Sequence, residues 1–415
     1  MFSLDRFYHI LHDNLISHFN HGRSFYFYPF GTYDSTNIID STIRAEDSKL
    51  TYEEFNIQRR LLRNMGEKYT FHCYFFDQEP LFSYTPAPVP GALDQFREQQ
   101  QRIIIIANSE KSEFKDQLLK RSKYQHDWYY FFHGFAALDW YRDFQYYDSK
   151  SFQEFDKVFI CCNHLISNYR SYRLHLVANL LEHGLTEHGY VSFFLKDQYG
   201  TWQDAITDPH SELSLDAKTK ILKHIGKLKT PLIIDTAEPN GSLSANVSMR
   251  TLTQALWHVV PETIFFQEKL HLTEKTFKPI VAKRPFILVA APGNLAYLKS
   301  YGFKTFDRWI DESYDNERDP YKRIEMITEQ LKKLCLLNKQ ELKQMHTEMQ
   351  EVLEHNFQHF YGDFKKIIVN ELVDNFQSIL TKINNGRQPN NHSRYHQRYD
   401  FPDGHLEQVK RRLLQ

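Results

Sequence analysis

The chain has 415 residues, of which 41% are hydrophobic and 25% charged, with 51 basic and 52 acidic side chains. This length exceeds what one hydrophobic core usually supports, so two packed domains with a ligand-binding cleft between them are expected. The formal net charge of −1 excludes a protein that binds nucleic acid chiefly through its global field, but it allows a local basic patch.

The cysteine content and the apolar segments indicate the cellular compartment in which the protein is expected. The four cysteines have neither the paired spacing of a zinc site nor the density of a disulfide framework, which favours a reducing compartment. Charged residues, Asp5, Arg6 and Asp13, interrupt the N-terminal apolar positions, which is not the pattern of a signal peptide. The longest apolar stretch, Phe286 to Ala291, is too short to span a bilayer. We therefore expect a cytoplasmic protein that makes no membrane contact.

The first half of the chain alternates strand-like aromatic runs with loops and helical stretches. The segments Ser24 to Gly31 and Phe71 to Leu81 have the alternation of strands, and Arg102 to Glu110 is typical of a fully buried strand. A further unit of strand, loop and helix begins at Lys157, and its helix is expected to stop at Gly184. This succession predicts an α/β fold.

The second half contains another compact α/β unit. A helix is expected after Thr273, followed by a buried strand over Pro285 to Ala290, a glycine-containing turn, a helix over Leu295 to Tyr301 and a final short strand. From about residue 319 to 383 the pattern is helical and strongly charged. The predicted domains are an N-terminal acceptor-side α/β domain (1–155), a C-terminal donor-binding α/β domain (156–318), C-terminal helices that pack back on the domains (319–385) and a polar basic tail (386–415).

The sharpest chemical signal is the segment HLTEKTFKPI. Thr273 is a helix-capping residue, so Glu274, Lys275 and Lys278 occupy the first turns of a helix whose N-terminal N–H groups favour an anion. A carboxylate binds sugar hydroxyls and a lysine neutralises a diphosphate, which is the combination that a sugar nucleotide requires. The alternative is an ordinary capped helix with surface charges.

Several segments, in order, resemble a known family. The TEK segment, the PFILV strand and the glycine turn are similar to the donor-binding half of the fucosyltransferase-like and exostosin-like glycosyltransferases. LTEKTFKPI, PFILV, YLKSYGFKTF and IDESYD together resemble glycosyltransferases found in large tailed bacteriophages. The resemblance covers roughly Val158 to Asp315. It implies a GT-B-like fold of two Rossmann-like domains facing a central cleft. It also implies a nucleotide-sugar co-substrate, with UDP- and GDP-sugars as the leading candidates, and inversion at the anomeric carbon. For a phage protein, the expected compartment is the host cell cytoplasm.

The resemblance also implies further donor-binding residues. CCNHLISNYRSYR supplies Asn163, Arg170 and Arg173, which match the family's element of an Asn and an Arg ahead of a helix, where an Arg contacts the donor phosphates. Which of the two arginines makes that contact stays open, and both are alternatively solvated residues beside a helix. In VPETIFF, Glu262 and Thr263 are weaker candidates for the nucleotide pocket.

Sugar transfer to a hydroxyl requires a general base, because the attacking hydroxyl sheds its proton as the bond forms. In a GT-B enzyme the N-terminal domain usually supplies it. The candidates are Asp77, Glu79 and His133, each of which follows a strand-like run. The alternatives are turn chemistry before Pro80 for the two acids and an ordinary core or surface histidine for His133.

The sequence also bears on the cofactor requirement and on the identity of the acceptor. It has no Asp-x-Asp motif, no GxGxxG and no P-loop, so neither a metal nor a tightly bound cofactor is expected. The phage resemblance points to a 5-hydroxymethylpyrimidine in double-stranded DNA as acceptor, with aromatic strand ends and the basic C-terminal segment as its contacts. A surface glycan, a lipid-linked sugar, a protein acceptor, a catalytically inactive binding module and a hydrolase are the alternatives.

Overall fold

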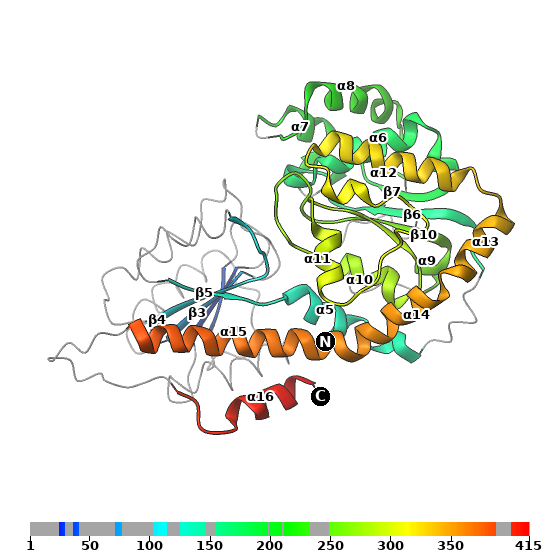
Figure 1. Ribbon diagram of the computed structural model, residues 1–415. Helices are drawn as coiled ribbons and strands as arrows, with labels where there is room; N and C mark the ends of the chain where they lie inside the picture. The colour runs from blue at the N-terminus through cyan, green and yellow to red at the C-terminus, as the bar shows by residue number, and fades with distance from the viewer. Residues whose placement is uncertain are drawn as a thin grey trace. The chain divides into compact units, whose positions relative to one another are not determined.

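The computed structural model describes residues 25–29, 36–40, 71–76, 103–113, 125–146, 154–197, 199–209, 211–232, 234, 249–386 and 400–414. Within these residues the chain divides into two compact units (Figure 1). The first comprises residues 1–139 and 365–415, and the second comprises residues 140–364. The chain therefore passes between the units twice. The domain boundaries expected at residues 155, 318 and 385 remain predictions.

The first unit contains a five-stranded sheet of order β2-β1-β3-β4-β5. Its strands are β1 (Phe25–Pro29), β2 (Thr36–Asp40), β3 (Phe71–Phe76), β4 (Ile103–Asn108) and β5 (Gln125–Tyr129). The β1–β2 pair is antiparallel and every other pair is parallel. β1, β3 and β4 lie within the segments that the sequence predicts as strands. The predicted α/β class is thus confirmed, with a largely parallel sheet.

Two C-terminal helices belong to this first unit. They are α15 (Lys365–Gly386) and α16 (His405–Leu414). Trp128 of β5 anchors α15, because its indole N–H donates to the Leu372 carbonyl at 3.2 Å and its ring lies 5.0 Å from that of Phe376. A buried indole requires such an acceptor. α5 (Phe132–Trp140) follows β5 and leads into the second unit.

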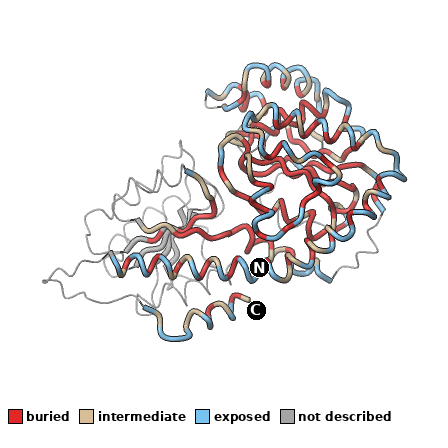
Figure 2. Tube along the Cα trace, viewed as in Figure 1, coloured by how far each residue is buried: buried red, intermediate tan, exposed pale blue. Residues whose placement is uncertain are grey.

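The second unit is built on a four-stranded, fully parallel sheet of order β11-β10-β6-β7. Its strands are β6 (Lys157–Asn163), β7 (Gly189–Phe193), β10 (Ala255–Pro261) and β11 (Phe286–Val289). Every residue of β10 and β11 is buried, as expected for parallel strands covered on both faces (Figure 2). β11 is apolar throughout and β10 is apolar except for His258, in keeping with this burial.

Helices cover both faces of the second sheet. α6 (Tyr172–Glu182) and α12 (Pro320–Cys335) lie on one face, and α10 (Glu274–Val281) lies on the other (Figure 1). The remaining helices of this unit are α7 (Trp202–Thr207), α8 (Leu215–His224), α9 (Met249–Thr253), α11 (Asn294–Ser300), α13 (Lys339–Glu348) and α14 (Gln350–His359). Gly184, the predicted stop of α6, adopts a left-handed φ of 65° just past the helix end, the conformation typical of a helix C-cap.

The prediction of a final short strand after Tyr301 is wrong. Residues 303–306 form no strand, because side chains satisfy their backbone groups. The Asn356 amide accepts from the Lys304 N–H at 2.8 Å and donates to the Lys304 carbonyl at 2.9 Å. The Glu312 carboxylate accepts from the Phe306 N–H at 2.7 Å. These partners replace the ladder that a neighbouring strand would provide.

No helix in the described part of the chain is both long enough and apolar enough to cross a bilayer.

The buried histidines of the second unit predict an acid-sensitive fold. Burial lowers the pKa of His175, His258 and His346 to about 4. Between about pH 6.5 and pH 4 the unfolded chain therefore binds more protons than the folded chain, so stability that is present above pH 6.5 is lost as the pH falls through this window. Each histidine should contribute a slope of about 1.4 kcal/mol per pH unit.

Denaturant midpoints measured from pH 7.5 to pH 5 test this expectation. His346 Nε2 lies 3.2 Å from Arg284 Nη1, so the imidazole is an acceptor there, and Gln provides an acceptor that does not titrate. His346→Gln should make the pH dependence shallower than in the parent protein. An unchanged slope would show that His346 stays solvated enough to protonate in the folded state.

Candidate functional site

The second sheet has a topological switch point between β6 and β10. These strands are neighbours, yet β6 continues to β7 on one side and β10 continues to β11 on the other. The two connections therefore leave the sheet in opposite directions, and the carboxyl ends of β6 and β10 are the place at which open α/β sheets bind ligands. β6 ends at Asn163 and β10 ends at Pro261.

Glu262, the first residue after β10, carries a carboxylate that accepts four hydrogen bonds. It is fully buried, with 0% exposure. Its Oε1 accepts from the Thr273 N–H at 3.1 Å and from the Thr276 hydroxyl at 2.6 Å, and its Oε2 accepts from the Thr273 hydroxyl at 2.6 Å and from the Thr263 N–H at 3.2 Å. Because both oxygens are occupied, the carboxylate binds the loop between β10 and α10 to the start of α10.

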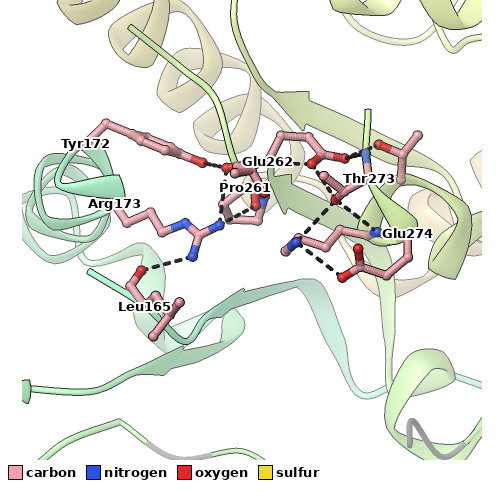
Figure 3. Close-up of polar contacts among 10 residues, drawn as sticks. Leu165, Tyr172, Arg173, Pro261, Glu262, Thr273 and Glu274 are labelled. Carbon is pink, nitrogen blue, oxygen red and sulfur yellow. Dashed lines mark hydrogen bonds and ion pairs between the residues drawn. The ribbon is translucent and has the colours of Figure 1, made fainter. Parts of the chain in front are cut away.

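Thr273 is the N-cap of α10, as the sequence predicts. Its hydroxyl oxygen accepts from the Lys275 N–H at 3.4 Å and from the Lys275 ammonium at 3.2 Å. The ammonium also donates to Glu274 Oε1 at 3.2 Å. The Glu274 side chain is 5% exposed and that of Lys275 is 28% exposed. Thr273 and Glu274 lie together at this end of α10 (Figure 3). Lys275, which contacts both, is more accessible than Glu274.

Lys278 lies one turn further along α10 and is half-buried. Burial, together with the positive charges of Arg284 and Lys278, lowers the pKa of His258 in the middle of β10. The Lys278 charge therefore lies beside the body of the sheet, whereas the Lys275 ammonium lies at the N-terminus of α10.

The two arginines predicted to bind phosphate occupy different environments. Arg173, on α6, is 2% exposed. Its Nη1 donates to the Leu165 carbonyl at 2.9 Å, and its Nη2 donates to the carbonyls of Pro261 at 2.9 Å and Glu262 at 3.2 Å (Figure 3). The Tyr172 hydroxyl also donates to the Glu262 carbonyl, at 2.5 Å. Arg173 therefore joins the loop after β6 to the end of β10.

Arg170 belongs to the short 3₁₀ helix Asn168–Arg170 that precedes α6, and it lies 4.2 Å over the Tyr169 ring. The Asp197 carboxylate fixes this loop by accepting from the N–H groups of Ile166 and Ser167. Arg170 is 6% exposed. Both arginines are therefore buried, and the terminal nitrogens of Arg173 lie on backbone carbonyls.

Asn163 is fully buried at the end of β6, and its amide lies 3.3 Å from the Cys161 sulfur. Burial raises the pKa of the Cys161 thiol to about 12, so this thiol is protonated at neutral pH and is a poor nucleophile. The pair is consequently a packed polar contact beneath the switch point.

The N-terminus of α10 differs from that of α11, which also begins at the carboxyl side of the sheet. The Asp315 carboxylate accepts from the N–H groups of Leu295 and Ala296 at 2.9 and 3.0 Å. This acidic cap occupies the start of α11 and repels an anion there. At α10 the cap is the Thr273 hydroxyl, and the Lys275 ammonium lies beside the Glu274 carboxylate, so this end carries a cation as well as the buried acids Glu262 and Glu274.

Among the residues of this site that sequence reasoning missed are Tyr141 and Thr276. Tyr141 is fully buried, and burial, followed by the negative charges of Glu274 and Glu262, raises its pKa well above the ordinary value. No local motif marks it, because it precedes those acids by more than a hundred residues. The other is Thr276, whose position three residues after the N-cap was the available signal.

The base candidates are only partly described. Asp77 and Glu79 lie outside the described residues. His133 lies in the first turn of α5, in the first unit, and is 6% exposed, with its ring 5.1 Å from that of Phe132 in an edge-to-face arrangement. Among the described residues no group of three or more His, Cys, Asp and Glu side chains is arranged to hold a metal ion.

No family model matches the chain, and no curated protein sequence or solved structure matches it either. The functional proposal therefore depends on this chain's own residues and geometry.

The three hydrogen bonds that Arg173 donates to backbone carbonyls predict that replacing this residue lowers the stability of the fold. Arg173→Lys should lower the free energy of unfolding by about 2 kcal/mol, because a single ammonium cannot reach three carbonyls and buried acceptors lose their partners. Chemical denaturation measures the change. Arg318, whose side chain is 81% exposed, is the matched control, and Arg318→Lys should stay within about 0.5 kcal/mol of the parent. Equal effects of the two substitutions would contradict a bracing role for Arg173.

Proposed function

We propose that the chain is a nucleotide-sugar-dependent glycosyltransferase with a GT-B-like arrangement, whose donor site lies at the carboxyl edge of the second sheet. The observation that carries the proposal is the Glu274–Lys275 pair at the capped N-terminus of α10, beside the β6–β10 switch point. The resemblance noted for the same segments points to the same function.

The donor chemistry assigns a role to each group. The Lys275 ammonium and the N-terminal end of α10 meet the negative charge of the diphosphate, and Arg170 adds a second cation from the other side of the switch point. Glu274 accepts from hydroxyls of the sugar or ribose. As the bond from the anomeric carbon to the phosphate oxygen breaks, its electron pair goes to that oxygen, and these cations stabilise the developing charge.

The attack by the acceptor hydroxyl requires a base from this chain. The acceptor hydroxyl attacks the anomeric carbon and passes its proton to a base, for which Asp77, Glu79 and His133 are the candidates. A single displacement of this kind inverts the anomeric centre. No metal ion is required in this scheme, because the side-chain cations carry the leaving-group charge.

Calorimetric titration with UDP-, GDP-, ADP- and CMP-linked sugars in the presence of a chelator tests the donor site. One nucleotide class should bind, and Lys275→Ala should weaken that binding about tenfold or more, since it removes a charge-assisted contact. Lys332, an exposed lysine that pairs with Glu329 on α12, provides the matched control Lys332→Ala, which should bind as the parent does.

Two results would count against this proposal. Full donor affinity in Lys275→Ala would place the donor site elsewhere. Failure of the parent protein to bind any nucleotide sugar would overturn the transferase assignment and favour a binding module without transfer activity.

For the acceptor we propose a 5-hydroxymethylpyrimidine in double-stranded DNA. Support comes from the basic residues of α16, which carries Arg411 and Arg412 on its exposed side. Lys410 of the same helix pairs with Asp374 at 3.2 Å. The other basic residues of this segment, Arg387, Arg394 and Arg398, lie outside the described residues. Phosphate contacts of this kind give DNA affinity that falls with salt.

Mass spectrometry of hydroxymethylated DNA incubated with the protein and its donor should reveal a gain of one sugar per modified base. Replacing both Arg411 and Arg412 with Gln should reduce the modification and weaken its salt dependence, because two phosphate contacts are lost, while donor binding persists. Unmodified DNA of the same sequence is the control. Transfer to a glycan or protein in place of DNA would reject this acceptor and retain the transferase.

A further inference from the structure

The Thr273 hydroxyl lies between the buried carboxylate of Glu262 and the partly exposed ammonium of Lys275. It lies 2.6 Å from Glu262 Oε2 on one side and 3.2 Å from Lys275 Nζ on the other. An ionised carboxylate only accepts hydrogen bonds and an ammonium only donates them. The hydroxyl hydrogen must therefore point to Glu262, which leaves the oxygen lone pairs facing Lys275.

Glu262 is poorly suited to touch a ligand itself. The residue has no exposed surface, and its two oxygens already receive four hydrogen bonds from Thr263, Thr273 and Thr276. Replacing any of these donors with a ligand group would leave a buried N–H or O–H without its partner. The orienting effect of the carboxylate nevertheless reaches the surface through the Thr273 hydroxyl.

We propose that Glu262 is a positioning residue that holds the Lys275 ammonium in place through the Thr273 hydroxyl. Two contacts, with Thr273 and with Glu274, fix the ammonium. An ammonium has three N–H groups, so one remains for an anionic oxygen of a ligand. This inference rests on the proposed function in one respect, which is that the ligand is the diphosphate of a nucleotide sugar.

This role differs from ordinary helix capping. Capping requires only that the Thr273 oxygen accept from a backbone N–H of the first turn. Positioning requires in addition that Glu262 fix the direction of the hydroxyl hydrogen. Loss of a cap weakens the helix regardless of the side chain at position 275, whereas loss of positioning matters only while Lys275 is present.

The first test measures the Lys275 amine without any ligand. Limited acetylation followed by peptide mass spectrometry gives the reaction rate of Lys275 relative to Lys332, which serves as the internal reference. Thr273→Val should raise this relative rate about tenfold, because the ammonium loses a charge-assisted hydrogen bond. Thr273→Ser, which keeps the hydroxyl, should recover most of the difference.

Matched variants separate the effect from a general loss of packing. Thr328 is also a buried threonine of the second unit, and its hydroxyl donates to the Ile324 carbonyl at 2.8 Å. Thr328→Val should leave the Lys275 rate unchanged. Should Thr273→Val not fold, Thr273→Ala removes the same hydroxyl without placing a methyl group against the carboxylate. An unchanged Lys275 rate in the folded variant would overturn the inference.

The second test is a double-mutant cycle on the affinity for the nucleotide sugar. Thr273→Val should weaken binding about tenfold when Lys275 is present and should have little further effect in a Lys275→Ala background. Equal losses in both backgrounds would overturn the positioning role and leave the proposed function standing. Faster acetylation in a protein that binds no nucleotide sugar would have the opposite meaning, since the hydroxyl contact would hold while the proposed function failed.

Discussion

The second unit depends on the burial of one carboxylate. Moving an ionised group out of water is costly unless hydrogen bonds replace the lost hydration. Glu262 meets this requirement with donors from the residue that follows it and from the first turn of α10, while its own carbonyl accepts from Tyr172 and Arg173 on α6. One residue thus joins the helices on the two faces of the sheet, and the geometry of the switch point follows from this junction.

The parts of the site that the sequence predicts are those encoded locally. Thr273 followed by an acid and a lysine predicts a capped helix with a charged first turn, and the structure has this helix from Glu274 to Val281. The buried strand expected over Pro285 to Ala290 is β11, and Gly184 ends α6 as expected. Each of these features depends on residues within about one turn or one strand of one another, so a short window contains the whole signal.

The remaining features depend on partners that are distant in sequence. Arg173 has the same residue type and spacing as a phosphate-binding arginine, but the carbonyls that engage it lie 8, 88 and 89 residues away. Residues 303–306 have a strand-like sequence, yet Asn356, 52 residues beyond Lys304, satisfies their backbone. Tyr141 lies near Glu274 only because the chain folds back. No local pattern specifies that Arg173 donates to these backbone carbonyls.

The division of the chain into units also divides the proposed chemistry. All of the candidate donor-binding residues lie between 140 and 364, whereas the candidate bases lie before residue 140. Within the second unit, Glu262 and Arg173 are each enclosed by hydrogen bonds, so they set distances and directions, and Lys275 and Arg170 supply the charge. A diphosphate would then meet cations whose positions are fixed before it binds, which lowers the reorganisation required as leaving-group charge develops. In the proposed scheme, affinity for the donor is accordingly a property of the second unit, and turnover requires residues of the first as well.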